Sequence, residues 1–241
     1  MKTIAAIPAR YAASRFPAKL MQLLGEKTII RHTYENTVAT HLFDEVMVVT
    51  DSEIIFSEIV QHGGYAVMSK LSHESGSDRI AEVIADIDVE IVINVQGDEP
   101  FVKKDILEKL VEIFANDTRH NVQVASPIHI ITDEALIKDP NTVKVVVDNK
   151  MNALLFSRSQ IPYPRDVSVN TIYYKHIGIY AFRKQALMNF TNWPVAPLEA
   201  AEKIECLRYL EHGIPLKMVL TSEAPVSIDT KEDLERAKAF L

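Results

Sequence analysis

Short apolar segments that alternate with helical patterns constrain the fold of this chain more than any other feature. Runs typical of buried strands occupy residues 3–7, 46–50, 66–68 and 91–95. Amphipathic helical periodicity is found at residues 28–40, 52–62, 79–85 and 103–115. Regular alternation of strand and helix predicts an α/β fold whose doubly wound sheet is mainly parallel.

The pattern changes near residue 120. Extended segments then follow one another with little helix between them, at residues 122–130, 143–148, 154–161 and 173–182. This spacing predicts a mixed or antiparallel insertion, a common place for a second substrate wall and an oligomer interface. A helix at 197–211, a strand at 216–220 and a last helix after Thr230 return to the first pattern. We therefore expect one integrated domain, with a nucleotide-binding core at 1–120 plus 212–241 and the insertion at 121–211.

Composition excludes several classes of protein. The 241 residues are 47% hydrophobic and carry a net charge of −7, which argues against a general nucleic-acid or anionic-membrane surface. Cys206 is the one cysteine, so no intrachain disulfide can form, which fits a reducing compartment. No apolar run reaches the length of a signal peptide or a transmembrane helix. We expect a cytoplasmic protein with no nucleic-acid partner and no membrane insertion.

The segment at residues 7–19, IPARYAASRFPAK, follows the first strand directly and holds the cations Arg10, Arg15 and Lys19. Its two prolines break any helical face, so we expect an ordered loop at the carboxyl end of that strand, where α/β sheets bind ligands. Neither a P-loop nor a dinucleotide-binding glycine pattern is present. A solvated surface loop explains the segment about equally well by itself, but cations without accompanying acids favour a polyphosphate site.

Two carboxylates are candidate metal ligands. Asp98 ends the strand at 91–95 within the sequence QGDEP, and Asp229 precedes the last helix within IDT. A turn-forming role for Asp98 and a helix-stabilising role for Asp229 are the alternatives. Because Mg²⁺ takes one or two carboxylates together with substrate phosphates, the pair fits a magnesium site.

Other polar residues have weaker signals. Residues 75–79, SGSDR, form either an ordinary helix cap or a site for a base edge or a phosphate. Arg158, His176 and Tyr180 lie on extended segments and suit an acidic sugar, although a half-exposed strand face is the alternative. The acids Glu199, Glu202 and Glu205 have the spacing of a solvated helix face. Cys206 has no base nearby in sequence, which favours a structural role.

Several of these motifs together resemble one family, the 3-deoxy-manno-octulosonate cytidylyltransferases, or CMP-Kdo synthetases. The resemblance runs nearly end to end and is carried by IPARYAASRFPAK at 7–19, SGSDR at 75–79, INVQGDEP at 93–100, FSRSQIP at 156–162, KHIGIYAF at 175–182, PLEAAEKIECLR at 197–208 and SIDTKEDLERA at 227–237. It implies a Rossmann-like sheet of the nucleotide-diphospho-sugar transferase type, transfer of CMP from CTP to Kdo for lipopolysaccharide synthesis, Mg²⁺ as cofactor, and a homodimer whose interface includes the insertion.

The resemblance also implies residue roles by position. The triphosphate of CTP would be held by Arg10, Ser14, Arg15 and Lys19. The cytidine side would be formed by Ser75, Gly76 and Arg79, and Mg²⁺ would be held by Asp98 and Asp229. The sugar-acid pocket would be lined by Gln96, Arg158, His176, Tyr180 and Glu205. The catalytic contributions would come from Arg10, Arg15, Lys19 and Asp98.

The sequence departs from the family pattern at three places. Ala13 stands where the family often has the serine that this chain carries as Ser14, and Ala18 replaces a usual glycine. Cys206 replaces a glutamine near the sugar, which leaves the 8-amino analogue of Kdo open as a substrate. A cytidylyltransferase for another acidic sugar and a nucleotide-binding homologue without catalysis are the alternatives. The second is disfavoured because every charged motif residue is present.

Overall fold

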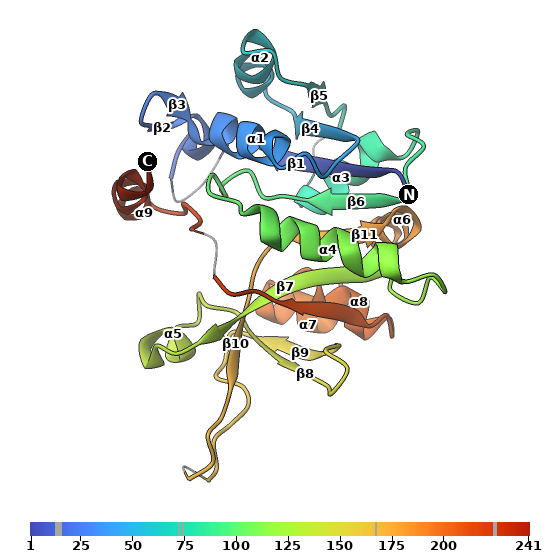
Figure 1. Cartoon of the computed structure of the whole chain (residues 1–241), viewed down its shortest axis with the longest axis vertical. Coiled ribbons are helices and arrows are strands. Elements are labelled where there is room, and N and C mark those ends of the chain that lie inside the picture. Colours follow the sequence, from blue (N-terminus) through green and yellow to red (C-terminus); the bar gives the residue numbers. More distant parts are fainter. Residues whose placement is uncertain (13–15, 72, 74, 167, 224–225) are drawn as a thin grey trace.

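The computed structural model describes residues 1–241 except 13–15, 72, 74, 167 and 224–225. Within this part of the chain, ten strands form one mixed sheet (Figure 1). Its first half is the parallel array β5–β4–β1–β6, formed by β1 (Thr3–Ala9), β4 (Glu45–Thr50), β5 (Ala66–Met68) and β6 (Ile91–Asn94). The intervening helices are α1 (Ile29–Ala39), α2 (Glu53–Gln61), α3 (Gly76–Ile84) and α4 (Lys104–Asn116). The predicted α/β fold with its parallel core is confirmed.

The second half of the sheet is mostly antiparallel and joins the first without a break. It contains β7 (Val124–Ile131), β8 (Lys144–Val147), β9 (Ala153–Ser157), β10 (Tyr173–His176), β11 (Tyr180–Arg183) and β12 (Leu216–Leu220). Strand β11 lies between β6 and β7 and is antiparallel to both, whereas β12 runs parallel to β7. The remaining elements are η1 (Lys19–Met21), β2 (Leu23–Leu24), β3 (Lys27–Thr28), α5 (Glu134–Lys138), α6 (Lys184–Asn192), α7 (Pro197–Glu202), α8 (Leu207–Glu211), α9 (Lys231–Ala237) and η2 (Lys238–Phe240).

Each face of the sheet has its own apolar core. Side chains of β1 alternate between the two: Ile7 belongs to the core that holds α1, α2 and α4, and Ile4 to the core that holds α3, α6 and α8. Burial on both faces explains why the parallel strands read as continuous apolar runs in the sequence. Polar groups are thereby concentrated at the strand ends.

The helix starts expected from sequence are confirmed by their caps. The Thr28 hydroxyl accepts a hydrogen bond from Arg31 N at 3.3 Å, and Ser75 Oγ accepts one from Asp78 N at 3.1 Å. Before α9, Thr230 and Asp233 exchange side-chain and backbone bonds as a capping box. No helix in the described ranges is long and apolar enough to span a bilayer.

Two expected elements are divided, and two helices were missed. The strand expected at 173–182 is two strands, β10 and β11. β10 pairs with β8 and β11 pairs with β6, so the chain changes its pairing partner between the two. The helix expected at 197–211 is interrupted at Lys203, whose φ of 54° and ψ of 47° are left-handed and end α7. Helices α5 and α6 were not predicted. Both divisions matter for the cavity described below, because residues of the connections at 177–179 and 203–206 line it.

Candidate functional site

Two adjoining cavities lie at the carboxyl ends of the central strands. The larger, of about 540 Å³, is lined by all five residues expected to bind the sugar acid and by both candidate metal ligands: Gln96, Arg158, His176, Tyr180, Glu205, Asp98 and Asp229. The smaller, of about 210 Å³, is lined by Arg10, Ser75, Gly76 and Arg79. Gln96 and Glu205 line both cavities, so the two spaces meet at these side chains. Residues from distant parts of the sequence are thus brought together at one edge of the sheet.

Asp98 and Asp229 converge on a single cation. Lys19 Nζ lies 2.5 Å from Asp98 Oδ2 and 3.0 Å from Asp229 Oδ1, and Ile228 N donates to the Asp98 carbonyl at 3.0 Å. Burial opposes the charge of Lys19, but the two carboxylates outweigh it and raise the pKa of the amine. Two carboxylates that share one cation form a donor set suited to a divalent metal with phosphate ligands. The pair therefore fits the expected Mg²⁺.

Ala18, beside Lys19, has a left-handed backbone with φ of 50° and ψ of 34°. An L-residue with a β-carbon pays about 1–2 kcal/mol there, and glycine does not. We expect Ala18→Gly to stabilise the protein by about 1 kcal/mol, or ~3 °C in melting temperature, after the entropy of the added glycine is counted. Ala39→Gly, at the exposed end of α1, is the matched control and should lower stability. A fall in melting temperature with Ala18→Gly would contradict the strain argument.

The loop after β1 contributes Arg10 to the smaller cavity, where the side chain is exposed. Ser14 and Arg15 lie outside the described residues. Gly76, at the start of α3, permits a close approach: a β-carbon there would lie 2.9 Å from Pro8 Cγ. The first turn of α3 is thereby held against the end of β1, as a compact nucleotide site requires.

Arg79 lies in the wall of the smaller cavity and is only 4% exposed. Its guanidinium donates to the Ala9 carbonyl at 2.7 Å and to Asp51 Oδ2 at 2.6 Å. Ser75 serves as the cap of α3, as the simpler interpretation of SGSDR had it, and also lines the cavity. Through these contacts Arg79 holds α3 against the end of β1, whether or not it also contacts a ligand.

On the other side, Arg158 is held by backbone oxygens. Its Nε donates to the Glu202 carbonyl at 2.6 Å and its Nη1 to the Pro140 carbonyl at 2.9 Å. The backbone amide of Arg158 also donates to the Glu202 carboxylate at 2.9 Å. Within the described ranges no carboxylate lies within ion-pairing distance of the guanidinium, although the charge of Arg158 helps to lower the pKa of Glu202.

His176 and Tyr180 form an aromatic wall. Their ring centroids are 5.4 Å apart, and Phe156 packs on the other side of the His176 ring. Ser126 Oγ lies 2.9 Å from His176 Nε2 and 2.8 Å from the Ile179 carbonyl. Because the serine has one proton and gives it to a carbonyl, His176 Nε2–H donates to Ser126 Oγ and Nδ1 is the acceptor. Burial, with Lys175 adding to it, lowers the pKa of His176 to about 3, so the ring stays neutral.

The low pKa of His176 predicts acid lability. Below about pH 6.5 the His176 imidazole is protonated in the unfolded chain but stays neutral in the folded one. The free energy of unfolding is therefore highest above pH 6.5 and falls as the pH drops toward 3. Between pH 6.5 and 5, wild type should lose roughly 1.5 kcal/mol more free energy of unfolding than His176→Gln. Urea unfolding at both pH values measures the difference. Equal losses in the two proteins would show that His176 is not held neutral by the fold.

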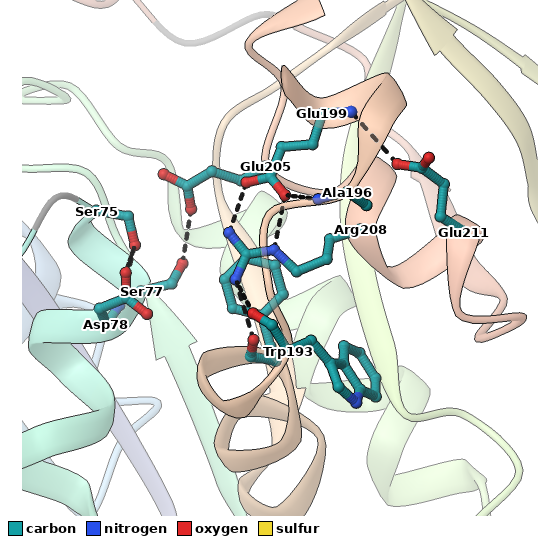
Figure 2. A network of polar contacts seen from close by, with 10 residues as sticks. Ser75, Ser77, Asp78, Trp193, Ala196, Glu199, Glu205, Arg208 and Glu211 are labelled. Carbon is teal, nitrogen blue, oxygen red and sulfur yellow. Dashed lines mark hydrogen bonds and ion pairs between the residues drawn. The ribbon is translucent and has the colours of Figure 1, made fainter. Parts of the chain in front are cut away.

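The expectation that three acids form a solvated helix face is wrong. Glu199 is buried and paired with Arg208, and Glu202 accepts from Ser157 Oγ at 2.6 Å. Figure 2 shows the third, Glu205, pointing toward Ser77 of α3, whose hydroxyl lies 3.1 Å from Glu205 Oε2. Burial is the main reason that the pKa of Glu205 is raised. The break at Lys203 separates Glu205 from the two acids of α7, and each acid has its own partner.

Cys206 is buried, with 1% of its surface exposed. The thiol lies close enough to the Tyr180 hydroxyl to affect its pKa, and burial raises the pKa of the thiol strongly, so it stays protonated. The predicted structural character fits this position. The residue nevertheless acts on the site, because it contacts a side chain that lines the larger cavity.

Glu99 and Lys175 also line the larger cavity and were missed by sequence reasoning. Both lie inside motifs that were noticed, QGDEP and KHIGIYAF. Burial, reinforced by Asp98, raises the pKa of Glu99 to about 8. The signal that could have found Glu99 is its place directly after a strand-end aspartate, where consecutive residues in a turn face the same crevice.

Known proteins resemble this chain closely. Residues 4–222 match a family model described as cytidylyltransferase. Proteins named 3-deoxy-manno-octulosonate cytidylyltransferase from Flavobacterium johnsoniae and Christiangramia forsetii are 59% and 56% identical, with 100% of this chain and 99% and 97% of theirs covered. A solved structure titled as CMP:2-keto-3-deoxy-manno-octonic acid synthetase complexed with CTP has a TM-score of 0.94 at 38% identity, covering 100% of this chain and 98% of the other.

Proposed function

The chain belongs to the 3-deoxy-manno-octulosonate cytidylyltransferase family, and from this premise we propose that it transfers CMP from CTP to the anomeric hydroxyl of a Kdo-type octulosonic acid. The products are the CMP-sugar, a precursor for lipopolysaccharide synthesis, and pyrophosphate. The observation that carries the proposal is the pair of cavities that meet at Gln96 and Glu205. The smaller cavity has the cation Arg10 at its edge, which suits a phosphate, and the larger has the polar wall for a sugar acid.

The reaction is a displacement at the α-phosphorus of CTP. The anomeric oxygen forms a bond to phosphorus, the bond to the β-phosphate oxygen breaks, and pyrophosphate leaves. Arg10, Arg15 and Lys19 stabilise the charge that gathers on the leaving group, and Ser14 donates to a phosphate oxygen. Each such contact contributes on the order of a hundredfold in rate. Ser75, Gly76 and Arg79 form the cytidine side.

Asp98 and Asp229 would hold Mg²⁺, and the ion when bound would supply Lewis-acid stabilisation of the phosphate charge and orientation of the attacking hydroxyl. The structural support is their shared contact with Lys19 Nζ. With a metal held by the two carboxylates, Lys19 would be free to contact phosphate oxygens. Lys19 would thus be the counter-ion of the carboxylates in the free enzyme and a phosphate ligand in the loaded one.

The sugar acid is recognised by groups of different chemistry. Arg158 meets the carboxylate, while Gln96, His176, Tyr180 and Glu205 hydrogen-bond the hydroxyls. His176, with Nε2–H given to Ser126, offers Nδ1 as an acceptor. Cys206, through Tyr180, shapes the part of the pocket in which an octulosonate and its 8-amino analogue are discriminated.

Pyrophosphate release from CTP, measured with Kdo, 8-amino-Kdo and sialic acid side by side, tests the activity and the sugar. Release with one of the octulosonic acids, abolished by a chelator and restored by Mg²⁺, is the expected result. Release only with sialic acid would favour a cytidylyltransferase for another acidic sugar. Tight CTP binding with no release for any acid would favour a non-catalytic homologue.

We further propose the division of labour and the assembly. Residues 1–120 and 212–241 bind the nucleotide, and residues 121–211 supply the sugar wall and the interface of a homodimer. Support comes from the connection between β9 and β10, which projects from the sheet in Figure 1 and exposes Tyr163, Val169 and Ile172. Light scattering of the purified protein at twice the chain mass is expected. The site of action is the cytoplasm, where CTP is available.

A further inference from the structure

Glu99 has a buried carboxyl oxygen with no hydrogen-bond partner in the described part of the chain. It is 6% exposed, and its Oε2 contacts no donor among the described residues. Its backbone is fixed on both sides, because Glu99 N donates to the Gln96 carbonyl and Val102 N donates to the Glu99 carbonyl, each at 3.1 Å. The side chain is therefore held at the wall of the larger cavity by the turn that carries it.

Such a placement is costly in the free protein. An unpaired polar group withdrawn from water costs about 1–3 kcal/mol. Glu199, which is also 6% exposed, shows how this fold satisfies a purely structural acid. Both of its oxygens receive hydrogen bonds from Arg208, at 2.6 and 2.7 Å. Glu99 has no equivalent donor in the described part of the chain.

A metal does not explain Glu99. The described residues contain no group of three or more acidic, histidine or cysteine side chains placed to hold one ion, so Glu99 does not join Asp98 and Asp229 at a common point. The remaining complement is a hydrogen-bonding group of a bound molecule, and the larger cavity is the one proposed to hold a molecule rich in hydroxyls.

We propose that Glu99 is a substrate-binding residue whose carboxyl accepts a hydrogen bond from a hydroxyl group of the sugar acid. The inference rests on the proposed function, since it takes the occupant of the larger cavity to be that sugar. It adds a residue between the metal-binding carboxylates and the His176–Tyr180 wall. Lys175 lies on the same cavity wall.

Steady-state kinetics of three variants test the role. Glu99→Met removes the acceptor at similar volume and should raise the KM for the sugar about tenfold or more, with the KM for CTP and the Mg²⁺ requirement within twofold of wild type. Glu99→Gln keeps an amide oxygen as acceptor and should stay within about threefold. Glu108→Gln, an exposed acid of α4, is the matched control and should change neither KM.

Thermal unfolding separates binding from a structural role. Without ligands, Glu99→Met should melt no lower than wild type, because the substitution removes a buried carboxyl that has an unpaired oxygen. An unchanged sugar KM, or equal rises in both KM values with a lower melting temperature, would overturn the proposal. If Glu99→Met does not fold, Glu99→Asp, whose carboxyl is one methylene shorter, must give the same selective rise in sugar KM.

The experiment distinguishes failure of the proposed function from failure of the Glu99 inference. Wild-type enzyme that releases no pyrophosphate with any octulosonic acid would overturn the proposed function. Wild-type enzyme that turns over while Glu99→Met keeps its sugar KM would overturn the inference alone.

Discussion

Replacing Asp98 with asparagine is expected to reduce turnover at least ~100-fold while the fold survives. The substitution removes the carboxylate that shares Lys19 with Asp229 and that would hold the metal. The fold should persist because the link to Ile228 uses the backbone carbonyl of residue 98, which asparagine retains. Pyrophosphate release gives the rate, and circular dichroism with thermal melting gives the folded fraction.

Two further variants sharpen the Asp98 experiment. Asp229→Asn should lose activity similarly, because the two carboxylates act on one cation. Asp86→Asn, the same chemical change at an exposed position, should leave turnover unchanged. Near-normal activity in Asp98→Asn would contradict the metal assignment, whereas lost activity with a lost melting transition would reassign Asp98 to folding.

The largest effect on stability is expected at the buried pair of Arg208 and Glu199. The two side chains are 6% and 8% exposed, and Arg208 also donates to the carbonyls of Phe190 and Trp193 and lies 3.9 Å over the Phe190 ring (Figure 2). Glu199→Gln should lower the free energy of unfolding by about 3 kcal/mol, because one buried charge loses its counter-charge. Urea unfolding measures the loss.

Controls for this pair distinguish burial from charge. Glu235→Gln breaks the exposed pair with Lys238 and should have no measurable effect. The double variant Glu199→Leu with Arg208→Met replaces both charges by apolar groups and should recover much of the loss. A double variant as unstable as Glu199→Gln would show that the hydrogen bonds of Arg208 to the two carbonyls carry the stability, and not the ion pair.

Local signals in the sequence were sufficient for the parallel core and the helix starts. Thr28, Ser75 and Thr230 each have a side-chain oxygen that caps a backbone amide a few residues on, so short-range chemistry decides these boundaries. Because a parallel strand is buried on both faces, it likewise appears in the sequence as a continuous apolar run. The end of each run and the cap of the next helix mark the edge of the sheet at which we expect ligands to bind.

Long-range placement was beyond the same reasoning. The break between β10 and β11 depends on which strands lie alongside, and helical spacing cannot report the left-handed turn at Lys203. From the sequence alone Glu199 is interpreted as a solvated acid, because its partner Arg208 lies nine residues later and meets it only in the folded structure. For Ala18 the replaced glycine was noticed, but only the structure gives the left-handed φ that makes the replacement costly.

The cavity walls shared by Gln96 and Glu205 restrict how this enzyme can diversify. Under the proposed placement of the substrates, a substitution at either position alters the space for both at once, so a gain in acceptance of a new sugar carries a cost for the nucleotide. Positions that border one cavity only, such as Arg158 and the Cys206–Tyr180 contact, are free of that trade-off. Natural variation in sugar preference should therefore accumulate at the second kind of position, while the shared wall stays fixed.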